Sequence, residues 1–237
     1  SQVDADAFRQ ATGLAEVPAL FPSVRLEGLP QGVFSERRPR SVVSCGTLEP
    51  ITTLPAMLWL ANEVWPRVRA QEPEARLDLY GRATASPLDE MRDRGIRVHG
   101  PVEDMLPHLH EGAVFVSPMF TGSGVRISVL NAMATGNAVV ATRVAAEGVP
   151  YRDGEDLFVH DDPQAFADAV CRLLGDEALR HRVGRAARAT VESDLFSWDA
   201  NAERLENHLR EAIRRFGQRR NAQDSTAASA SREGANQ

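Results

Sequence analysis

The sequence predicts an α/β protein whose core is a doubly wound, Rossmann-like parallel sheet, followed by a helical C-terminus. Short runs rich in Val, Ile, Leu and Phe alternate with segments whose apolar residues recur at helical spacing. The runs are nearly continuous in apolar residues, as expected for parallel strands that are buried on both faces. Several of them end in glycine or proline. In an open α/β sheet, the loops at the carboxyl ends of the strands form the ligand crevice.

The composition is that of an ordinary globular protein. Its 237 residues are enough for one large domain, or for one domain with an appendage. The formal net charge of −6 gives no indication of a nucleic-acid partner. Cys45 and Cys171 lie far apart in the sequence, so a reducing, intracellular setting is expected rather than a disulfide framework. No apolar run is long enough to span a bilayer and no signal peptide is visible, so we expect a cytoplasmic protein.

Residues 1–40 lack regular patterning, and the boundary of the N-terminal remnant and linker is placed after residue 36. There "DADAFRQATG" predicts one short helix closed by Gly13, and "GLPQGVFSERRPR" is a linker rich in Gly, Pro and Arg. From residue 37 to 195 the alternation predicts the Rossmann-like domain. Strands are expected at 41–46, 75–81, 96–100, 113–118, 137–142 and 155–160. Helices are expected at 54–70, 86–95, 103–112 and 126–136, the second with Ser86 as N-cap and Pro87 as its first residue.

The C-terminal third is predicted to be helical. Asp162 and Pro163 start one helix, whose apolar stripe consists of Phe166, Ala169, Val170, Leu173 and Leu174. Asp176 caps the next helix, and Ser197 caps the last one, which we place at 196–217. The stripe of this last helix consists of Trp198, Ala202, Leu205, Leu209, Ile213 and Phe216. Residues 218–237 have no apolar period and are expected to be a disordered tail.

The stretch "GSGVRISVLNAMATGNAVVAT" carries the strongest functional signal. Gly122 and Gly124 let the backbone approach a ligand closely. A helix predicted at 125–135 would present unsatisfied amides and a positive dipole end to an anion. Arg126, expected in its first turn, adds a cation whose planar fork suits phosphate oxygens. The alternative is that the glycines only form a tight turn and that Arg126 is solvated.

Taken together, these motifs resemble the C-terminal, donor-binding domain of family-4 glycosyltransferases with the GT-B fold, particularly bacterial sugar transferases of surface-polysaccharide assembly. The glycine-rich stretch is joined by "SCGTLEP", "LYGR", "VHGPVEDMLPHL", "AAEGVPYRDGEDLFVHDDPQAFADAVCRLLGD" and "FSW". The resemblance covers about residues 28–215. "VDADAFR" and "LPQGVF" resemble the end of the first domain and the interdomain linker. The acceptor-binding N-terminal half is therefore expected to be missing from the chain, or supplied by a partner chain.

The resemblance implies a binding site for a nucleoside-diphosphate sugar, with no cofactor and no metal. Gly46 and Thr47 would face the diphosphate or the sugar, and Arg82 would line the cleft. The backbone from His99 to Val102 would contact the nucleobase. The diphosphate would be held by the loop of Gly122, Ser123, Gly124, Val125 and Arg126.

Two positions depart from the family pattern. Position 131 is normally a glutamate that accepts hydrogen bonds from the ribose, and here it is Asn131, whose amide oxygen lacks charge-assisted strength. The second basic residue of the usual Arg-x-Lys pair is replaced by Ser128. The donor site is therefore expected to be weakened or to take a different donor.

Three functional hypotheses follow. The first is the nucleotide-sugar-binding part of a glycosyltransferase that transfers a sugar to a glycan or lipid-linked acceptor. As a fragment it is not expected to be self-sufficient, and no acid, base or nucleophile is assigned to it. The second is a degenerate, non-catalytic interaction module, and the third is an epimerase of the same fold. A nucleoside diphosphate titration distinguishes the first from the second.

Several other residues have more ordinary interpretations. His99, His108 and His110 lack the i, i+4 spacing of metal-binding histidines on one helix face, so no metal site is expected. The acidic residues between 153 and 162 are interpreted as loop and cap residues. Glu147 lies near the crevice, where contact with the sugar and a capping role are both open. The arginine-rich last helix either packs on protein or lies peripherally on the inner membrane face.

Overall fold

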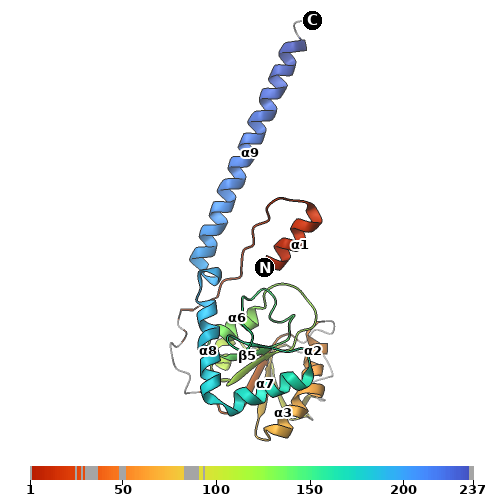
Figure 1. Ribbon diagram of the computed structural model, residues 1–237, viewed down its shortest axis with the longest axis vertical. Coiled ribbons are helices and arrows are strands. Elements are labelled where there is room, and N and C mark those ends of the chain that lie inside the picture. The colour runs from red at the N-terminus through yellow and green to blue at the C-terminus, as the bar shows by residue number, and fades with distance from the viewer. Residues whose placement is uncertain are drawn as a thin grey trace.

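The computed structural model describes residues 2–24, 26, 27, 29, 37–47, 52–82, 91, 92 and 94–234, with side chains as far as residue 218. Within these residues the chain forms a parallel sheet between two layers of helices, and helix α9 projects from this body as a long rod (Figure 1). The helix expected at 86–95, with Ser86 and Pro87 at its start, lies mostly outside the described residues.

The described sheet has six parallel strands in the order β3-β2-β1-β4-β5-β6. The strands are β1 (Ser41–Cys45), β2 (Arg76–Tyr80), β3 (Ile96–His99), β4 (Val114–Ser117), β5 (Ala138–Ala141) and β6 (Phe158–Val159). Each falls where the apolar runs predicted it, so the doubly wound Rossmann-like fold is confirmed. The strand order reverses between β1 and β4, and such a switch point opens a crevice beyond the carboxyl ends of the strands.

Helices cover both faces of the sheet. One face carries α2 (Thr53–Trp59), η1 (Leu60–Val64), α3 (Trp65–Gln71) and α7 (Pro163–Gly175). The other carries α5 (Leu106–Glu111), α6 (Ile127–Ala134) and α8 (Glu177–Val191). Three further elements stand at the ends of the chain: α1 (Gln2–Thr12), the short η2 (Asp194–Phe196) and α9 (Trp198–Gly234).

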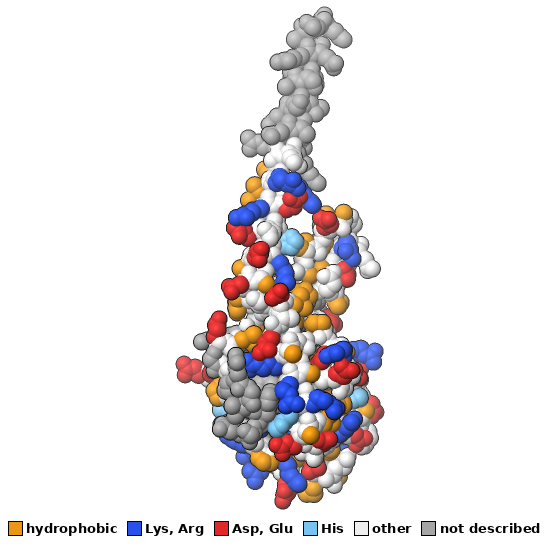
Figure 2. Space-filling model, turned by 60° about the vertical axis from the view of Figure 1, so that its left-hand side comes forward, with side chains coloured by type: hydrophobic (Ala, Val, Ile, Leu, Met, Phe, Trp, Pro, Cys, Tyr) orange, Lys and Arg blue, Asp and Glu red, His pale blue; other side chains and the backbone are white. Residues whose placement is uncertain are grey.

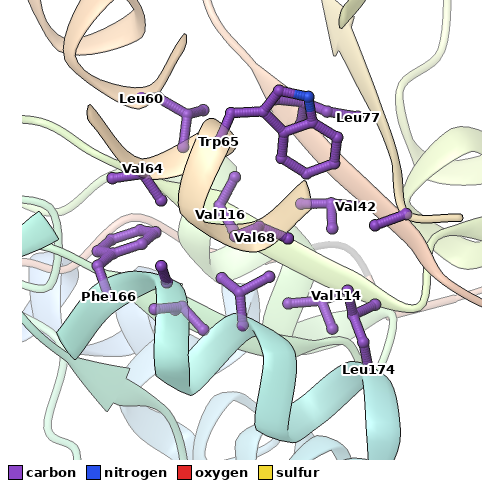
Figure 3. Close-up of a cluster of buried hydrophobic side chains, with 14 of the residues drawn as sticks. Val42, Leu60, Val64, Trp65, Val68, Leu77, Val114, Val116, Phe166 and Leu174 are labelled. Carbon is purple, nitrogen blue, oxygen red and sulfur yellow. The ribbon is translucent and has the colours of Figure 1, made fainter. Parts of the chain in front are cut away.

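The strands contribute alternate side chains to two hydrophobic cores. Val42 faces the core under α3 and α7, whereas its neighbour Val43 faces the core under α6 and α8. Figure 3 shows the first core, in which Trp65 and Phe166 lie against side chains from the sheet; both aromatic residues are fully buried. Burial of both faces explains why the strands have apolar sequences without a polar side.

The helix expected at 54–70 is interrupted by a π-helical turn. The α-helical hydrogen bonding of α2 gives way to the π turn η1, and resumes at Trp65. Pro66 explains the interruption, because it has no amide hydrogen and its ring clashes with the carbonyl four residues earlier, that of Asn62. The wider π turn is one way to relieve this conflict.

The predicted N-caps of the C-terminal helices are confirmed. Asp162 accepts hydrogen bonds from the amides of Gln164 and Ala165 at 3.0 and 2.9 Å. Asp176 accepts from Leu179 at 2.8 Å, and the Ser197 hydroxyl accepts from Ala200 at 3.3 Å. These caps fix where α7, α8 and α9 begin.

Helix α9 leaves most of its apolar stripe uncovered. The exposed large residues on it are Trp198, Leu205, Leu209, Ile213 and Phe216. Figure 2 shows hydrophobic side chains on the surface of the projection formed by α9 and the N-terminal segment. The two are joined by an ion pair of 3.1 Å between Arg215 and Glu16.

The helical backbone of α9 continues to Gly234, past the expected boundary at residue 217. Residues 218–234 include many Ala, Arg and Gln residues and no proline. This composition permits a helix even though the segment has no apolar stripe to pack.

We predict that Gly184→Ala destabilises the domain although alanine favours a helix. A Cβ on Gly184 of α8 would lie 2.2 Å from the carbonyl oxygen of Gly136, which follows the C-cap of α6. Such overpacking costs about 1–3 kcal/mol, so the melting temperature should fall by roughly 2–10 °C. Gly217→Ala is the control, because nothing lies within 4 Å of its added Cβ. Equal melting temperatures for the wild type and Gly184→Ala would contradict the prediction.

Candidate donor-binding site

A cleft of about 500 Å³ lies at the carboxyl ends of β1, β2 and β3. Its lining residues are Cys45, Gly46, Thr47, Tyr80, Gly81, Arg82, Pro101, Val102 and Met105. The structure thus brings together four of the residues that the sequence marked as binding residues, Gly46, Thr47, Arg82 and Val102. The thiol of Cys45 in the wall is free, and burial raises its pKa to about 11, so it is protonated at neutral pH.

The floor of this cleft depends on direct contact between two backbone segments. The Gly46 amide donates to the Tyr80 carbonyl at 3.0 Å, and the Gly81 amide donates to the Gly100 carbonyl at 3.3 Å. Gly81 has a φ of +146°, and a Cβ at this position would lie 1.9 Å from the Gly46 carbonyl oxygen. Only glycine fits here, so the loops after β1 and β2 meet without a side chain between them.

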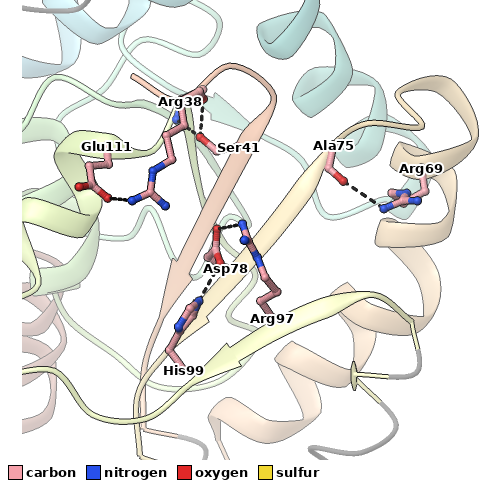
Figure 4. A network of polar contacts seen from close by, with 9 residues as sticks. Arg38, Ser41, Arg69, Ala75, Asp78, Arg97, His99 and Glu111 are labelled. Atoms are coloured by element: carbon pink, nitrogen blue, oxygen red, sulfur yellow. Dashed lines mark hydrogen bonds and ion pairs between the residues drawn. The ribbon is translucent and has the colours of Figure 1, made fainter. Parts of the chain in front are cut away.

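The His99 side chain belongs to a polar network on the edge of the sheet. Its Nε2 lies 2.7 Å from the buried Asp78 carboxylate, whose second oxygen accepts from Arg97 at 2.8 Å (Figure 4). The Tyr80 ring stacks on the His99 ring with 4.4 Å between centroids, and on that of His108 with 4.5 Å. Of the expected base-contacting stretch, Pro101 and Val102 line the cleft, whereas the His99 imidazole contacts Asp78.

The glycine loop, residues 121–126, connects β4 to α6. Gly122 and Gly124 have φ values of +107° and +80°, a left-handed conformation that glycine adopts without strain. Ser123 is exposed, and Val125 is half-buried against the core. β4 and β1 are parallel neighbours in the sheet. This loop therefore starts at the same carboxyl end of the sheet as the cleft residues that follow β1.

The structure corrects the expected place of Arg126. Helix α6 begins at Ile127, and Arg126 is its N-cap residue, with extended backbone angles, rather than a residue of the first turn. Its guanidinium folds back over Gly122 and donates from Nη2 to the Thr121 carbonyl at 3.0 Å. Its Nε is buried and has no hydrogen-bond partner among the residues that the structure describes. A buried donor without a partner is costly, so this guanidinium is poised to bind an acceptor.

The backbone amide of Gly124, the second glycine of the loop, is hydrogen-bonded to a glutamate. The Gly124 amide donates to Oε1 of Glu147 at 3.2 Å. Gly124 lies in the loop before α6 rather than in the first turn of that helix, so Glu147 binds the loop and does not cap α6. Asp4 of α1 places another carboxylate nearby, with its Oδ2 3.5 Å from where a Cβ on Gly124 would stand. The sequence contained one indication of this contact, because Glu147 follows β5 and the glycine loop follows β4, the strand beside it.

Asn131 lies neither on the glycine loop nor in the wall of the cleft. It is half-buried on α6, and its backbone carbonyl accepts from Thr135. Arg126 and Asn131 are five residues apart, so they stand on different sides of the helix axis.

Among the described residues, no group of three or more His, Cys, Asp or Glu side chains is placed to hold a metal ion. No helix within the same part of the chain combines the length and the apolarity needed to cross a membrane.

Comparison with known proteins identifies the family. A model of the family described as "Glycosyl transferases group 1" matches residues 39–176. This is more than half of the 237 residues, and the chain belongs to that family. The sequence-based resemblance to glycosyltransferases of the GT-B fold is thereby confirmed.

Curated relatives support the assignment. A phosphatidyl-myo-inositol mannosyltransferase of Mycobacterium tuberculosis is 27% identical over 212 residues, which cover 84% of this chain and 53% of the relative. An uncharacterized 44.6 kDa protein in the cps region of Klebsiella pneumoniae is 28% identical over 140 residues, covering 55% and 36%. The chain thus spans about a third to a half of the length of these relatives.

A solved structure confirms the fold. The Anabaena protein Alr3699/HepE, crystallised with UDP-glucose, superposes with a TM-score of 0.71 at 16% identity. The match covers 89% of this chain and 62% of that protein.

We predict that Gly81→Ala destabilises the domain strongly and that Gly100→Ala does not. At position 81 the new Cβ combines backbone strain with overlap on Gly46, so unfolding in urea should become easier by about 3 kcal/mol. Gly100, in the neighbouring loop, has open space around its Cβ position. Its substitution should change the free energy of unfolding by less than about 0.5 kcal/mol. Similar unfolding midpoints for both variants would show that the backbone contact is unimportant.

Proposed function

We propose that this chain is the nucleotide-sugar-binding domain of a bacterial glycosyltransferase, which transfers a sugar to a glycan or lipid-linked acceptor. The observation that carries the proposal is the glycine loop at the switch point of the sheet, in a chain of this family. Two left-handed glycines and the N-terminus of α6 stand there beside a guanidinium with a buried, unpartnered Nε. An anion with several acceptor oxygens is the ligand that suits this arrangement.

In this proposal the diphosphate binds at the glycine loop. The backbone of Gly122, Ser123, Gly124 and Val125 approaches its oxygens, and the guanidinium of Arg126 provides the positive charge. Arg126 as N-cap residue is suited to this role, because its side chain starts outside the helix and already folds over Gly122. The binding anion would also offset the unfavourable placement of a cation at the positive end of α6.

The nucleoside extends from the loop into the adjoining cleft. Gly46 and Thr47 face the diphosphate or the sugar, and Arg82 stands at the cleft wall. Pro101 has no amide hydrogen, and the Gly100 carbonyl accepts from Gly81. We therefore assign the base contact to the backbone of Val102. Asn131 is assigned to the ribose by its family register alone.

The reaction needs little covalent chemistry from this domain. The bond between the anomeric carbon and the phosphate oxygen breaks, and the diphosphate keeps the electron pair. The acceptor hydroxyl oxygen bonds to the anomeric carbon, and its proton passes to solvent. This domain contributes positioning and electrostatic stabilisation of the leaving diphosphate. No acid, base or nucleophile is assigned to it.

The acceptor half of the site belongs to a part outside this chain. In the proposal, residues 1–36 are the end of an N-terminal domain and the interdomain linker, and residues 37–195 are the donor-binding domain. The exposed stripe of α9 then packs on the N-terminal half, supported by the ion pair that sets α9 beside the segment after α1. A reducing, cytoplasmic setting fits the free thiols of Cys45 and Cys171.

The proposal is tested by calorimetric titration of the purified chain with UDP, GDP and ADP. At least one should bind, and Arg126→Ala should weaken it by about 1.5–3 kcal/mol, the range for a hydrogen bond to a charged group. Arg210→Ala is the matched control, because it removes the same charge from an exposed position on α9. Failure of all three nucleotides to bind would favour a non-catalytic interaction module.

A second prediction concerns Asn131. Replacement by glutamate introduces an ionised acceptor for the ribose hydroxyls, and a charge-assisted hydrogen bond is roughly twice as strong as a neutral one. Asn131→Glu should tighten nucleoside diphosphate binding by about 1 kcal/mol. A 2′,3′-dideoxy analogue should show no such gain. Equal gains in affinity for both ligands, or weaker binding of the nucleoside diphosphate, would show that Asn131 does not contact the ribose.

A further inference from the structure

Glu147 is held against the glycine loop by a buried turn. The segment after β5 is folded by hydrogen bonds from the Ala146 amide to the Thr142 carbonyl at 3.0 Å and from the Val149 amide to the Ala146 carbonyl at 3.2 Å. Ala145 and Ala146 are fully buried. The Thr142 hydroxyl also bonds to the Met119 carbonyl of the segment after β4. The carboxylate is therefore positioned by packed backbone.

The position of this carboxylate is unusual for an anion-binding loop. Its Oε1 accepts from the Gly124 amide at 3.2 Å. The donor diphosphate is assigned to the same loop, so a fixed negative charge stands next to the place where phosphate charge accumulates. A carboxylate this close interacts strongly with each phosphate charge, because the separation is far below the screening length of about 8 Å at physiological salt.

The charge on the phosphate changes during the proposed reaction. In a nucleotide sugar each phosphate has one ester bond and shares the anhydride oxygen, so the diphosphate carries two negative charges. After transfer, the oxygen that was bonded to the anomeric carbon keeps the electron pair. The free terminal phosphate then carries an additional charge at neutral pH, because its second pKa is about 6.

We propose that Glu147 is a specificity-determining residue that favours the nucleotide sugar over the free nucleoside diphosphate. The inference rests on the proposed donor site. The carboxylate repels the additional charge of the product more than it opposes the donor, and its bond to the Gly124 amide reforms when the product leaves. Glu147 thus limits inhibition by the product and promotes its release.

The test compares Glu147→Gln with the wild type in calorimetric titrations of UDP and UDP-glucose, and of the GDP and ADP pairs. Glutamine keeps the shape of the side chain and an oxygen acceptor for the Gly124 amide, and it removes the charge. Glu74→Gln is the control. Glu74 precedes β2, so it lies at the opposite end of that strand from the cleft, and its side chain is 78% exposed.

Glu147→Gln should bind the free nucleoside diphosphate about five- to tenfold more tightly, because one repulsion is removed. Its affinity for the nucleotide sugar should rise by a smaller factor, because that diphosphate carries one negative charge fewer, and Glu74→Gln should change neither affinity. Equal changes for both ligands, or weaker binding of the nucleotide sugar alone, would overturn the inference. If the wild type binds no nucleotide of the panel, the donor-site proposal fails as well. If nucleotides bind but Glu147→Gln keeps the wild-type preference between the nucleotide sugar and the free nucleoside diphosphate, only the proposed role of Glu147 is wrong.

Discussion

Backbone polar groups in the central strands find their partners within the sheet, because the side chains of β1, β4 and β5 are buried on both faces. This constraint shapes the rest of the molecule. Parallel strands need crossover helices, and these helices bury the two faces. Backbone groups that can bind a ligand then remain mainly at the strand ends. The crevice at the switch between β1 and β4 follows from this arrangement.

Two close backbone contacts determine how tightly the layers and loops fit. Gly184 lets α8 approach the end of α6, and Gly81 lets the loop after β2 touch that after β1. The first contact seats the helix that presents the glycine loop, and the second closes the floor of the cleft. Both the stability of the domain and the geometry of the cleft therefore depend on glycine, which has no Cβ, at a close backbone contact.

Two charged side chains at the glycine loop already form hydrogen bonds to its backbone. Arg126 bonds to the Thr121 carbonyl, and Glu147 bonds to the Gly124 amide. In the proposed donor site, a diphosphate that binds at this loop has to replace these contacts with its own. The affinity for the diphosphate then depends on the difference in free energy between the two sets of contacts.

Local sequence patterns determined the strands, the caps at Asp162 and Asp176, and the existence of a glycine loop before a helix. These features depend on periodicity and on residues close together in the chain. The π turn before Pro66 and the N-cap position of Arg126 were missed, because each depends on a shift of one or two residues in backbone hydrogen bonding.

Tertiary structure alone decided the contacts between distant residues. The bond from Gly124 to Glu147, the network of Asp78 with His99, and the fit of Gly81 on Gly46 each join separate strands or loops. No local propensity encodes such contacts, since they arise only when the sheet places strand ends side by side. The sequence by itself determined which groups are available at the crevice, and the packing of the sheet decided which of them touch.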